Sequence, residues 1–281
     1  LGLPPDATDW APVDAELNPP AEPTARQHAS HKGCHGDVAI VGGESHAARG
    51  MGMTGAAILA AQAALHGGAG RVLLSLLGPD PLATPASPDL MRRALPDLDL
   101  PNLTVVAGCG GGRAIVAQLG RLLQHSARLV LDADALNAVA QDPWLQRLLT
   151  DRAARQQATV LTPHPLEAAR LLGTHTAEVQ ADRLEAARQM AQRFDCCVVL
   201  KGSGTVVAAP GHTPRINTTG NGLLATGGTG DVLAGLVGAR LASSGQAWQA
   251  ACDAVWCHGH AADTWPQGWA LSASRLADRL S

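Results

Sequence analysis

The sequence predicts an α/β protein with a mostly parallel central sheet that is covered by helices on both faces. From residue 37 onward, short apolar runs alternate with longer segments of helical periodicity, which is the pattern of parallel strands joined by helical crossovers. Nearly every predicted strand is followed at once by glycines or polar residues. Because ligands bind at the carboxyl ends of parallel strands, these segments predict one shared cleft.

The predicted strands are short runs of β-branched and aliphatic residues, each ended by a turn signal. The first, 37–41, stops at a glycine pair, and the third, 103–107, stops at the run Gly-Cys-Gly-Gly-Gly. The strand at 196–200 leads into a β-ribbon. The ribbon comprises 205–208 and 215–217, and the other strands are predicted at 71–77, 128–131 and 159–161.

The predicted helices are the longer segments in which apolar residues recur every three or four positions. An alanine-rich stretch without proline predicts a helix over 54–66, whereas six prolines between 78 and 101 predict a long loop. A further helix starts at His164 and Pro165. The remaining helices are predicted at 114–124, 176–193, 230–242, 246–264 and 272–280.

The chain is predicted to consist of an arm and one domain. Residues 1–30 contain six prolines and show little periodicity, so they predict an irregular N-terminal arm or linker. Residues 31–281 contain no strong internal repeat or boundary. A segment of that length can bury one large core, which predicts a single domain.

Composition argues against several classes of function. A net charge of −3 and an aromatic content of 2% disfavour binding to nucleic acid or to an anionic membrane. No apolar run approaches the roughly 20 residues of a membrane span. Six scattered cysteines predict reduced thiols in a cytoplasmic protein. The cluster Cys252, Cys257, His258 and His260 predicts helix packing rather than a metal site.

Three familiar catalytic patterns are absent from the sequence. Gly108 and Gly110 are followed by Arg113 where a dinucleotide-binding fingerprint needs a third glycine. The chain has two lysines, Lys32 and Lys201, and neither lies in a P-loop pattern. No Gly-x-Ser-x-Gly motif occurs either. The sequence therefore indicates neither a standard dinucleotide dehydrogenase nor a P-loop ATPase, and it disfavours an α/β-hydrolase.

Residues 220–235 carry the strongest functional signal. Five glycines precede Asp231 and a periodic apolar segment follows it, which predicts a glycine-rich loop that leads into a helix. The free N–H groups and the dipole of a helix start favour phosphate. A carboxylate there, expected to be ionised at neutral pH, suits a residue that faces a hydroxyl about to receive a phosphoryl group. Alternatively, Asp231 only caps the helix.

Other strand ends supply further candidates, each with a structural alternative. Residues 201–205 can offer phosphate one cation, hydroxyls and N–H groups, or can form a simple tight turn. Glu167 can orient Mg²⁺ or its waters, or can serve the dipole of its own helix. Asp132, Asp134 and Asn137 can bond ligand hydroxyls, or can act as turn and cap residues.

The chain resembles the ADP/ATP-dependent NAD(P)H-hydrate dehydratases of the ribokinase-like superfamily. The resemblance covers about residues 31–265 and rests on an ordered set of motifs. These are HKGxxGDVAIVGG, TGAAILAAQAALHGGAG, SPDLM, LDADALN, LTPHPLEAARLL, KGSGT, NGLLATGGTGDVLAG and CHGHAAD. The resemblance implies a ribokinase-like three-layer α/β/α sandwich.

The resemblance also implies an activity. A member would dehydrate (6S)-NADHX or NADPHX, the hydrated forms of NADH and NADPH, with ADP or ATP and Mg²⁺ as cofactors. With ADP, the hydroxyl would be phosphorylated and then eliminated, so that AMP and phosphate are released. A homo-oligomer such as a tetramer is implied. The opening Leu-Gly-Leu-Pro resembles the end of the epimerase domain of bacterial members, which implies fusion to, or action with, an NAD(P)H-hydrate epimerase.

Carried over residue by residue, the resemblance assigns roles in the site. Asp231 would act on the hydroxyl of the hydrate, and Glu167 would occupy the position that organises Mg²⁺, through water. The substrate-contacting residues would be Ala56, Gly112 and His164, to which the residue types add Asp132 and Asn137. The residues that hold the adenine nucleotide would be Lys201, Gly202, Ser203, Gly204, Thr205, Thr229 and Gly230.

The sequence departs from the family pattern in three places. Leu166 stands where a glycine is expected after His-Pro, so the local turn is expected to differ. Gly-Cys-Gly-Gly-Gly replaces the more usual Gly-Pro-Gly-Leu-Gly, which leaves Gly110 as an alternative to Gly112. Residues 44–53 form a longer segment than usual at one lip of the cleft.

Two rival functions are consistent with the same residues. A small-molecule kinase of this fold, acting on a vitamin precursor or a sugar hydroxyl, would use the same aspartate but release a stable phosphorylated product. A non-catalytic nucleotide-binding protein would bind ADP without turnover. Turnover of a hydrated dinucleotide, and its dependence on Asp231, distinguish the three functions.

Overall fold

The computed structural model describes residues 14–22, 28–45, 52–78 and 87–280. Its central strands are β2 (Asp37–Gly42), β3 (Arg71–Leu76), β5 (Thr104–Ala107), β6 (Arg128–Leu131), β7 (Thr159–Leu161) and β8 (Cys197–Leu200). The outer strands are β1 (Glu16–Leu17), β4 (Met91–Arg92), β9 (Val206–Ala208) and β10 (Arg215–Ile216). The sheet has the order β1-β10-β9-β8-β7-β6-β5-β2-β3-β4, and every pairing outside β9 is parallel.

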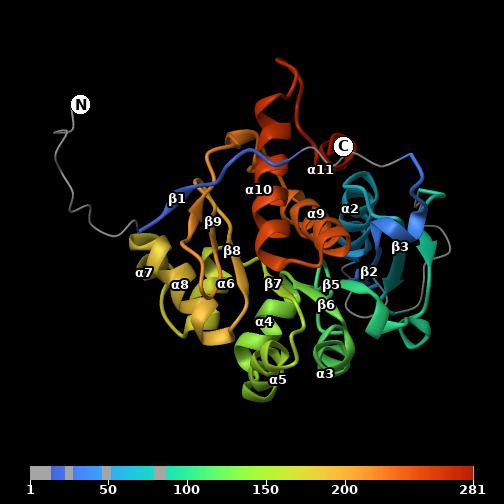
Figure 1. Ribbon diagram of the computed structural model, residues 1–281, viewed down its shortest axis with the longest axis horizontal. Helices are drawn as coiled ribbons and strands as arrows, with labels where there is room; N and C mark the ends of the chain where they lie inside the picture. The colour runs from blue at the N-terminus through green and yellow to red at the C-terminus, as the bar shows by residue number, and fades with distance from the viewer. Residues whose placement is uncertain (1–13, 23–27, 46–51, 79–86, 281) are drawn as a thin grey trace.

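Helices cover both faces of this sheet, as predicted (Figure 1). One layer holds α2 (Thr54–His66), α9 (Thr229–Ser244), α10 (Ala247–Asp263) and α11 (Ala273–Ala277). The opposite layer holds α3 (Val116–His125), α4 (Asp134–Gln141), α5 (Pro143–Ala154), α6 (Pro165–Leu172), α7 (Thr176–Ala181) and α8 (Arg183–Phe194). Four single-turn 3₁₀ segments are also described: Lys32–His35, Leu95–Asp97, Leu100–Asn102 and Gly222–Leu224.

The contact between α2 and α9 is unusually close. A Cβ atom at Gly235 of α9 would lie 2.0 Å from the carbonyl oxygen of Ala60 of α2. The facing residues of α2 are mostly alanines, of which Ala57, Ala61 and Ala64 are fully buried. Small side chains let two helix backbones approach each other, so α9 lies directly against α2 and is fixed by it.

Several predicted elements differ from the structure. The single helix predicted over 176–193 is wrong, because the chain leaves the helical conformation at Asp182. The Asp182 carboxylate accepts a hydrogen bond from the Glu185 N–H at 2.9 Å and thereby caps the start of α8. Helices α4 and α5 were not predicted, and the predicted long loop after β3 contains the short strand β4.

The N-terminal arm is not irregular throughout. Within its described part, β1 pairs in parallel with β10 at the edge of the sheet. The buried Asn18 side chain donates to the Cys252 carbonyl at 2.9 Å and to Asn217 Oδ1 at 3.1 Å, which ties the arm to α10. Residues 1–13 and 23–27 lie outside the described residues, and the division at residue 30 stays a prediction. Among the described residues, no helix has the length and apolar character needed to cross a membrane.

Arg152 joins α5 to the end of α3 and to β7. It is completely buried, and it donates to Thr159 Oγ1 (2.7 Å) and to the carbonyls of Leu123 (2.9 Å) and Ser126 (3.0 Å). Burial lowers its pKa to about 10. We expect Arg152→Met to lower the free energy of unfolding by about 2–4 kcal/mol, because it leaves buried acceptors without donors.

Urea unfolding measures this loss. Arg147→Met is the matched control, because Arg147 is exposed on the same helix and its replacement should change stability by less than about 0.5 kcal/mol. Equal effects of the two substitutions would contradict a structural role for the buried guanidinium.

Candidate active site

The site is built around the start of α9. Gly228 precedes the helix with φ +91°, and a Cβ atom there would lie 2.7 Å from a methyl carbon of Leu59. The Thr229 hydroxyl lies 2.8 Å from the Leu224 carbonyl oxygen, so it is engaged within its own loop. The Thr229 carbonyl faces Nε2 of His258 at 2.9 Å. Because burial lowers the pKa of His258 to about 4, this ring is neutral and donates to that carbonyl, which ties α10 to the start of α9.

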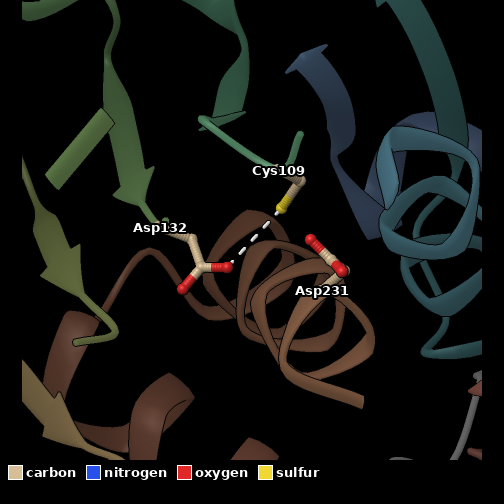
Figure 2. Close-up of side chains that lie close together, drawn as sticks. All are labelled: Cys109, Asp132 and Asp231. Atoms are coloured by element: carbon tan, nitrogen blue, oxygen red, sulfur yellow. Dashed lines mark hydrogen bonds between the residues drawn. The ribbon is translucent and has the colours of Figure 1, made fainter. Parts of the chain in front are cut away.

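Asp231 lies in the first turn of α9 and meets two side chains from neighbouring strand ends. Cys109 follows β5 and Asp132 follows β6, and one ligand atom from each of the three residues lies within 4.8 Å of the others (Figure 2). The Cys109 thiol donates to Asp132 Oδ2 at 3.8 Å. Cys109 is fully buried and Asp132 is 2% exposed. The ends of β5 and β6 and the start of α9 therefore bring together a compact acidic group.

The Oδ1 atom of the Asp132 carboxylate is held by two donors. Lys201 Nζ and Thr162 Oγ1 each lie 2.7 Å from its Oδ1 atom. The residue that follows, Ala133, has φ +49° and ψ −113°, a strained conformation that places Asp132 and Asp134 on either side of the turn. Strain of this kind persists where surrounding contacts fix the backbone, as the two bonds to Asp132 do here.

Lys201 lies between this carboxylate and the start of α9. A Cβ atom at Gly230 would be 3.4 Å from Lys201 Nζ, so the ammonium faces the first turn of the helix. Glu167 Oε2 is 4.0 Å from the same nitrogen. Burial lowers the pKa of Lys201, but the charges of Asp132 and Glu167 outweigh it, so that the pKa is raised overall. Lys201 is thus a permanent cation at the place predicted to receive phosphate.

Asp231 is a weaker acid than a surface aspartate. Burial raises its pKa to about 6, and the charge of Asp132 acts in the same direction, whereas the Cys109 thiol and Lys201 lower the pKa. The carboxylate is therefore mostly ionised at pH 7, in line with the expectation from its place in the helix, and it loses its charge below about pH 6.

His164 and Glu167 form a reciprocal cap at the start of α6. His164 Nδ1 accepts from the N–H groups of Leu166 (3.1 Å) and Glu167 (3.3 Å), and Glu167 Oε2 accepts from the His164 N–H at 2.8 Å. Glu167 Oε1 lies 3.2 Å from His164 Nε2. Because both carboxylate oxygens are engaged and burial raises the pKa of Glu167 to about 7, this side chain does not fit as a direct Mg²⁺ ligand. The structure supports its alternative role at the helix start.

The loop 201–205 is shaped by Arg183 of α8. The guanidinium donates to the carbonyls of Leu200 (3.1 Å) and Lys201 (3.2 Å), and also to the carbonyl of Ser203. Gly202 has φ +147°, and a Cβ atom there would lie 2.7 Å from Arg183. The carbonyl groups of the loop thus point toward Arg183. Ser203 lies on the exposed side of the loop.

The remaining predicted residues lie around the loop after β5. The Gly112 N–H donates to Asp134 Oδ2 at 2.7 Å. Ala56 packs on the same loop, because a Cβ atom at Gly110 would be 2.9 Å from the Ala56 methyl. Asn137 is directed elsewhere, since its oxygen accepts from Arg170 of α6 at 2.6 Å. Residues 46–51 of the predicted cleft lip lie outside the described residues.

The raised pKa values of two buried carboxyl groups predict a pH dependence of stability. The pKa values of Glu167 and Asp231 in the folded protein are about 7 and about 6, above the ordinary values of 4.5 and 3.8. Between those limits the folded state binds protons that the unfolded state has released, so stability falls as the pH rises from about 4 to 7.

We expect Asp231→Asn to remove part of this dependence. Relative to the wild type, the variant should gain stability as the pH rises from about 4 to 7, because a neutral amide carries no titrating charge. Urea unfolding midpoints at pH 4.5 and pH 7.5 measure the difference. A difference between the two proteins that is the same at both pH values would contradict the raised pKa.

Comparison with known proteins decides the family. The model of the family described as NAD(P)H-hydrate dehydratase matches residues 38–281. The chain belongs to the NAD(P)H-hydrate dehydratase family. It is 42% identical over 265 residues to the ADP-dependent (S)-NAD(P)H-hydrate dehydratase of Neisseria meningitidis, covering 92% of this chain and 86% of that protein. The family resemblance drawn from the motifs is confirmed.

Two other relatives show how much of a longer enzyme this chain spans and which fold it shares. The chain is 40% identical to the bifunctional NAD(P)H-hydrate repair enzyme of Escherichia coli over 85% of its own length but only 45% of that enzyme. The Bacillus subtilis ADP/ATP-dependent NAD(P)H-hydrate dehydratase, co-crystallized with ATP/Mg²⁺, has 29% identity and a TM-score of 0.75, with 92% of both chains covered.

A second solved structure confirms the fold. A ribokinase-like superfamily protein of Enterococcus faecalis superposes with a TM-score of 0.74 at 22% identity, covering 92% of this chain and 89% of that one. At this identity the likeness concerns the fold alone. The predicted ribokinase-like α/β/α architecture is therefore confirmed.

The motifs did not reveal the contacts that organise the site. Cys109 was noted only as a departure within a glycine run, and its position between two carboxylates was missed. Lys201 was assigned to the nucleotide, and its ion pair with Asp132 was missed. One signal in the sequence pointed to a special role for Lys201: the chain has only two lysines and otherwise uses arginine as its basic residue.

Proposed function

We propose that this protein dehydrates (6S)-NADHX and NADPHX back to NADH and NADPH, with ADP as the phosphoryl donor and AMP and phosphate as products. One observation carries the proposal within the family: Asp231 lies at the start of α9, beside the Lys201 ammonium and the ends of β5 and β6. This is the arrangement that a phosphoryl transfer to a hydroxyl requires.

The chemistry divides into transfer and elimination. The hydroxyl oxygen of the hydrate attacks the β-phosphorus of ADP, its proton passes to the Asp231 carboxylate, and AMP departs. The ring C–O bond then breaks, and phosphate leaves with that oxygen. Loss of a proton from the neighbouring ring carbon restores the double bond, so the net change is loss of water from the hydrate and hydrolysis of ADP.

The residues around Asp231 would stabilise the charge that moves with the phosphoryl group. The N–H groups of the first turn of α9 have no partners within the helix, and Lys201 Nζ faces Gly230 at its start. Fixed donors of this kind stabilise a phosphoryl transition state without reorganisation. The exposed side of the loop 201–205 would hold the rest of the adenine nucleotide.

Magnesium would enter with the nucleotide phosphates and neutralise part of their charge. The carboxylate of Glu167 is engaged by His164 and by the start of α6, so it would reach the ion only through water. The substrate side of the cleft would be formed by the loop after β5, which contains Gly112 and packs on Ala56, together with His164. Asn137, which is paired with Arg170, would join only after a rearrangement.

Incubation of hydrated NADH with ADP and Mg²⁺ tests the function. We expect recovery of the NADH absorbance with one AMP and one phosphate formed per NADH, and no recovery without nucleotide. A phosphorylated product that accumulates without NADH would instead identify the kinase. Binding of ADP with no turnover of any hydrate would identify the non-catalytic alternative.

Three wider expectations accompany the proposal. The protein would act together with an NAD(P)H-hydrate epimerase, because the bifunctional relative is named for repair of the same compounds. It would form a homo-oligomer, which the mass of the native protein in solution tests. It would act in the cytoplasm, where the six cysteines, which are all free, would stay reduced.

A further inference from the structure

We propose that Glu44 is a positioning residue whose buried side chain holds the wall of the cleft against which the hydrated dinucleotide binds. The inference rests on the proposed function, because that function places the dinucleotide against Gly112 and Ala56. It assigns a role to the first residue of the segment 44–53, whose length departs from the family pattern.

The Glu44 side chain accepts hydrogen bonds from the loop after β5. Its Oε1 atom accepts from the Arg113 N–H at 3.1 Å and from the Ala114 N–H at 3.0 Å. Glu44 is 3% exposed, so these bonds are shielded from water. The helix that follows, α3, begins at Val116 without a side-chain cap of its own. Glu44 therefore supplies, from the end of β2, the acceptor that the turn leading into α3 needs.

The backbone of the same residue ties this loop to the start of α2. The Glu44 N–H donates to the Gly110 carbonyl at 2.7 Å, and the Glu44 carbonyl accepts from the Met53 N–H at 3.0 Å. The Met53 carbonyl in turn accepts from the Ala56 N–H at 3.1 Å. Glu44 is thus bonded to both segments that would contact the substrate, the loop that contains Gly112 and the start of the helix that contains Ala56.

A second carboxylate holds the adjacent residue of the loop. The Gly112 N–H donates to Asp134 Oδ2 at 2.7 Å, so the three successive N–H groups of residues 112–114 all bond to carboxylates. The two carboxylates come from different elements of the fold. Because both are needed to bind these three N–H groups, loss of the Glu44 side chain should loosen the loop at residues 112–114.

The effect of Glu44 should be confined to substrate binding. The part of the loop nearest to Asp231 contains Cys109. It is held by the Gly43 N–H, which donates to the Cys109 carbonyl at 3.0 Å, and this bond does not involve the Glu44 side chain. Replacement of Glu44 should therefore loosen residues 112–114 and leave the surroundings of Asp231 in place. Loss of binding that is equal in the ground state and the transition state raises KM and leaves kcat unchanged.

Steady-state kinetics with hydrated NADH at saturating ADP test this role. In Glu44→Met, which keeps the length of the side chain but removes its oxygen atoms, KM should rise about 10-fold while kcat stays within about threefold. Glu44→Ala should have the same effect without a bulky side chain. Glu44→Gln, whose amide oxygen can accept both bonds, should keep KM within about threefold of the wild type. Glu178→Met, at an exposed glutamate of α7, should change neither constant.

Two further measurements separate positioning from a general loss of stability. Exchange of the Arg113 and Ala114 amide protons should become faster in Glu44→Met and Glu44→Ala but not in Glu44→Gln. The affinity for ADP, measured by calorimetric titration, should stay within about twofold in all three variants, because ADP would bind at the start of α9.

The outcomes distinguish the inference from the proposed function. An unchanged KM in Glu44→Met and Glu44→Ala, or a fall in kcat at constant KM, would overturn the inference while the proposed function stands. An equal rise of KM in Glu44→Gln would also overturn it, since the two hydrogen bonds would then not be the cause. A wild type that does not dehydrate hydrated NADH would overturn the proposed function, and the inference would fall with it.

Discussion

Asp231→Asn is expected to lower kcat for dehydration by about 10³-fold or more while the affinity for ADP stays within about threefold of the wild type. The amide keeps the shape of the carboxylate but cannot accept the hydroxyl proton. The amides of α9 and the ammonium of Lys201, which would hold the phosphates, are unchanged by the substitution. The separation of turnover from binding is therefore the signature of a base.

Single-turnover kinetics with hydrated NADH and calorimetric titration with ADP measure the two quantities. Asp151→Asn is the matched control, because Asp151 is an exposed aspartate on α5 and should leave both unchanged. Persistent turnover in Asp231→Asn would mean that another group accepts the proton. A parallel loss of ADP affinity would mean that the helix start itself is damaged.

Lys201→Met is expected to weaken ADP binding by about 10- to 100-fold and to lower the free energy of unfolding by about 3 kcal/mol. The ammonium would contribute to ADP binding because it faces the start of α9. It contributes to stability because it pairs with Asp132 at 2.7 Å. Its removal leaves a carboxylate that is 2% exposed without its cation. Lys32→Met is the control, because Lys32 is the only other lysine of the chain and is exposed.

The double variant Lys201→Met/Asp132→Asn separates the two effects. It should recover most of the lost stability, because residue 132 no longer carries a charge that needs the ammonium, but it should not recover ADP affinity. Urea unfolding and calorimetric titration measure these outcomes. Stability that stays low in the double variant would show that the lysine matters for packing rather than for charge pairing.

The fold was predictable where local patterns are strong. The central strands β2, β3, β5, β6, β7 and β8 lie within one residue of their predicted limits, because each is an apolar run ended by a turn signal. The helix α5 was missed although Asp142 caps it and Pro143 opens it, which is a recognised start signal. The strand β1 has two residues and depends on pairing with β10, a contact that no local pattern encodes.

The site was predictable in its residues but not in their pairings. The glycine-rich segment indicated that Asp231 lies at the start of a helix, and the structure places it in the first turn of α9, which begins at Thr229. The bond between Lys201 and Asp132 joins residues 69 positions apart, so it depends on the order of strands in the sheet. His164 and Glu167 were correctly expected at a helix start, but the sequence did not reveal that they satisfy each other there.

The close contact of Gly235 with the backbone of Ala60 has a consequence for the reaction cycle. A helix seated against its neighbour without intervening side chains has no room to slide or roll. We therefore expect Asp231 to keep its position during the reaction cycle, and any closure around bound reactants to come from the loops that face it. Catalytic alignment would then depend on how far those loops travel.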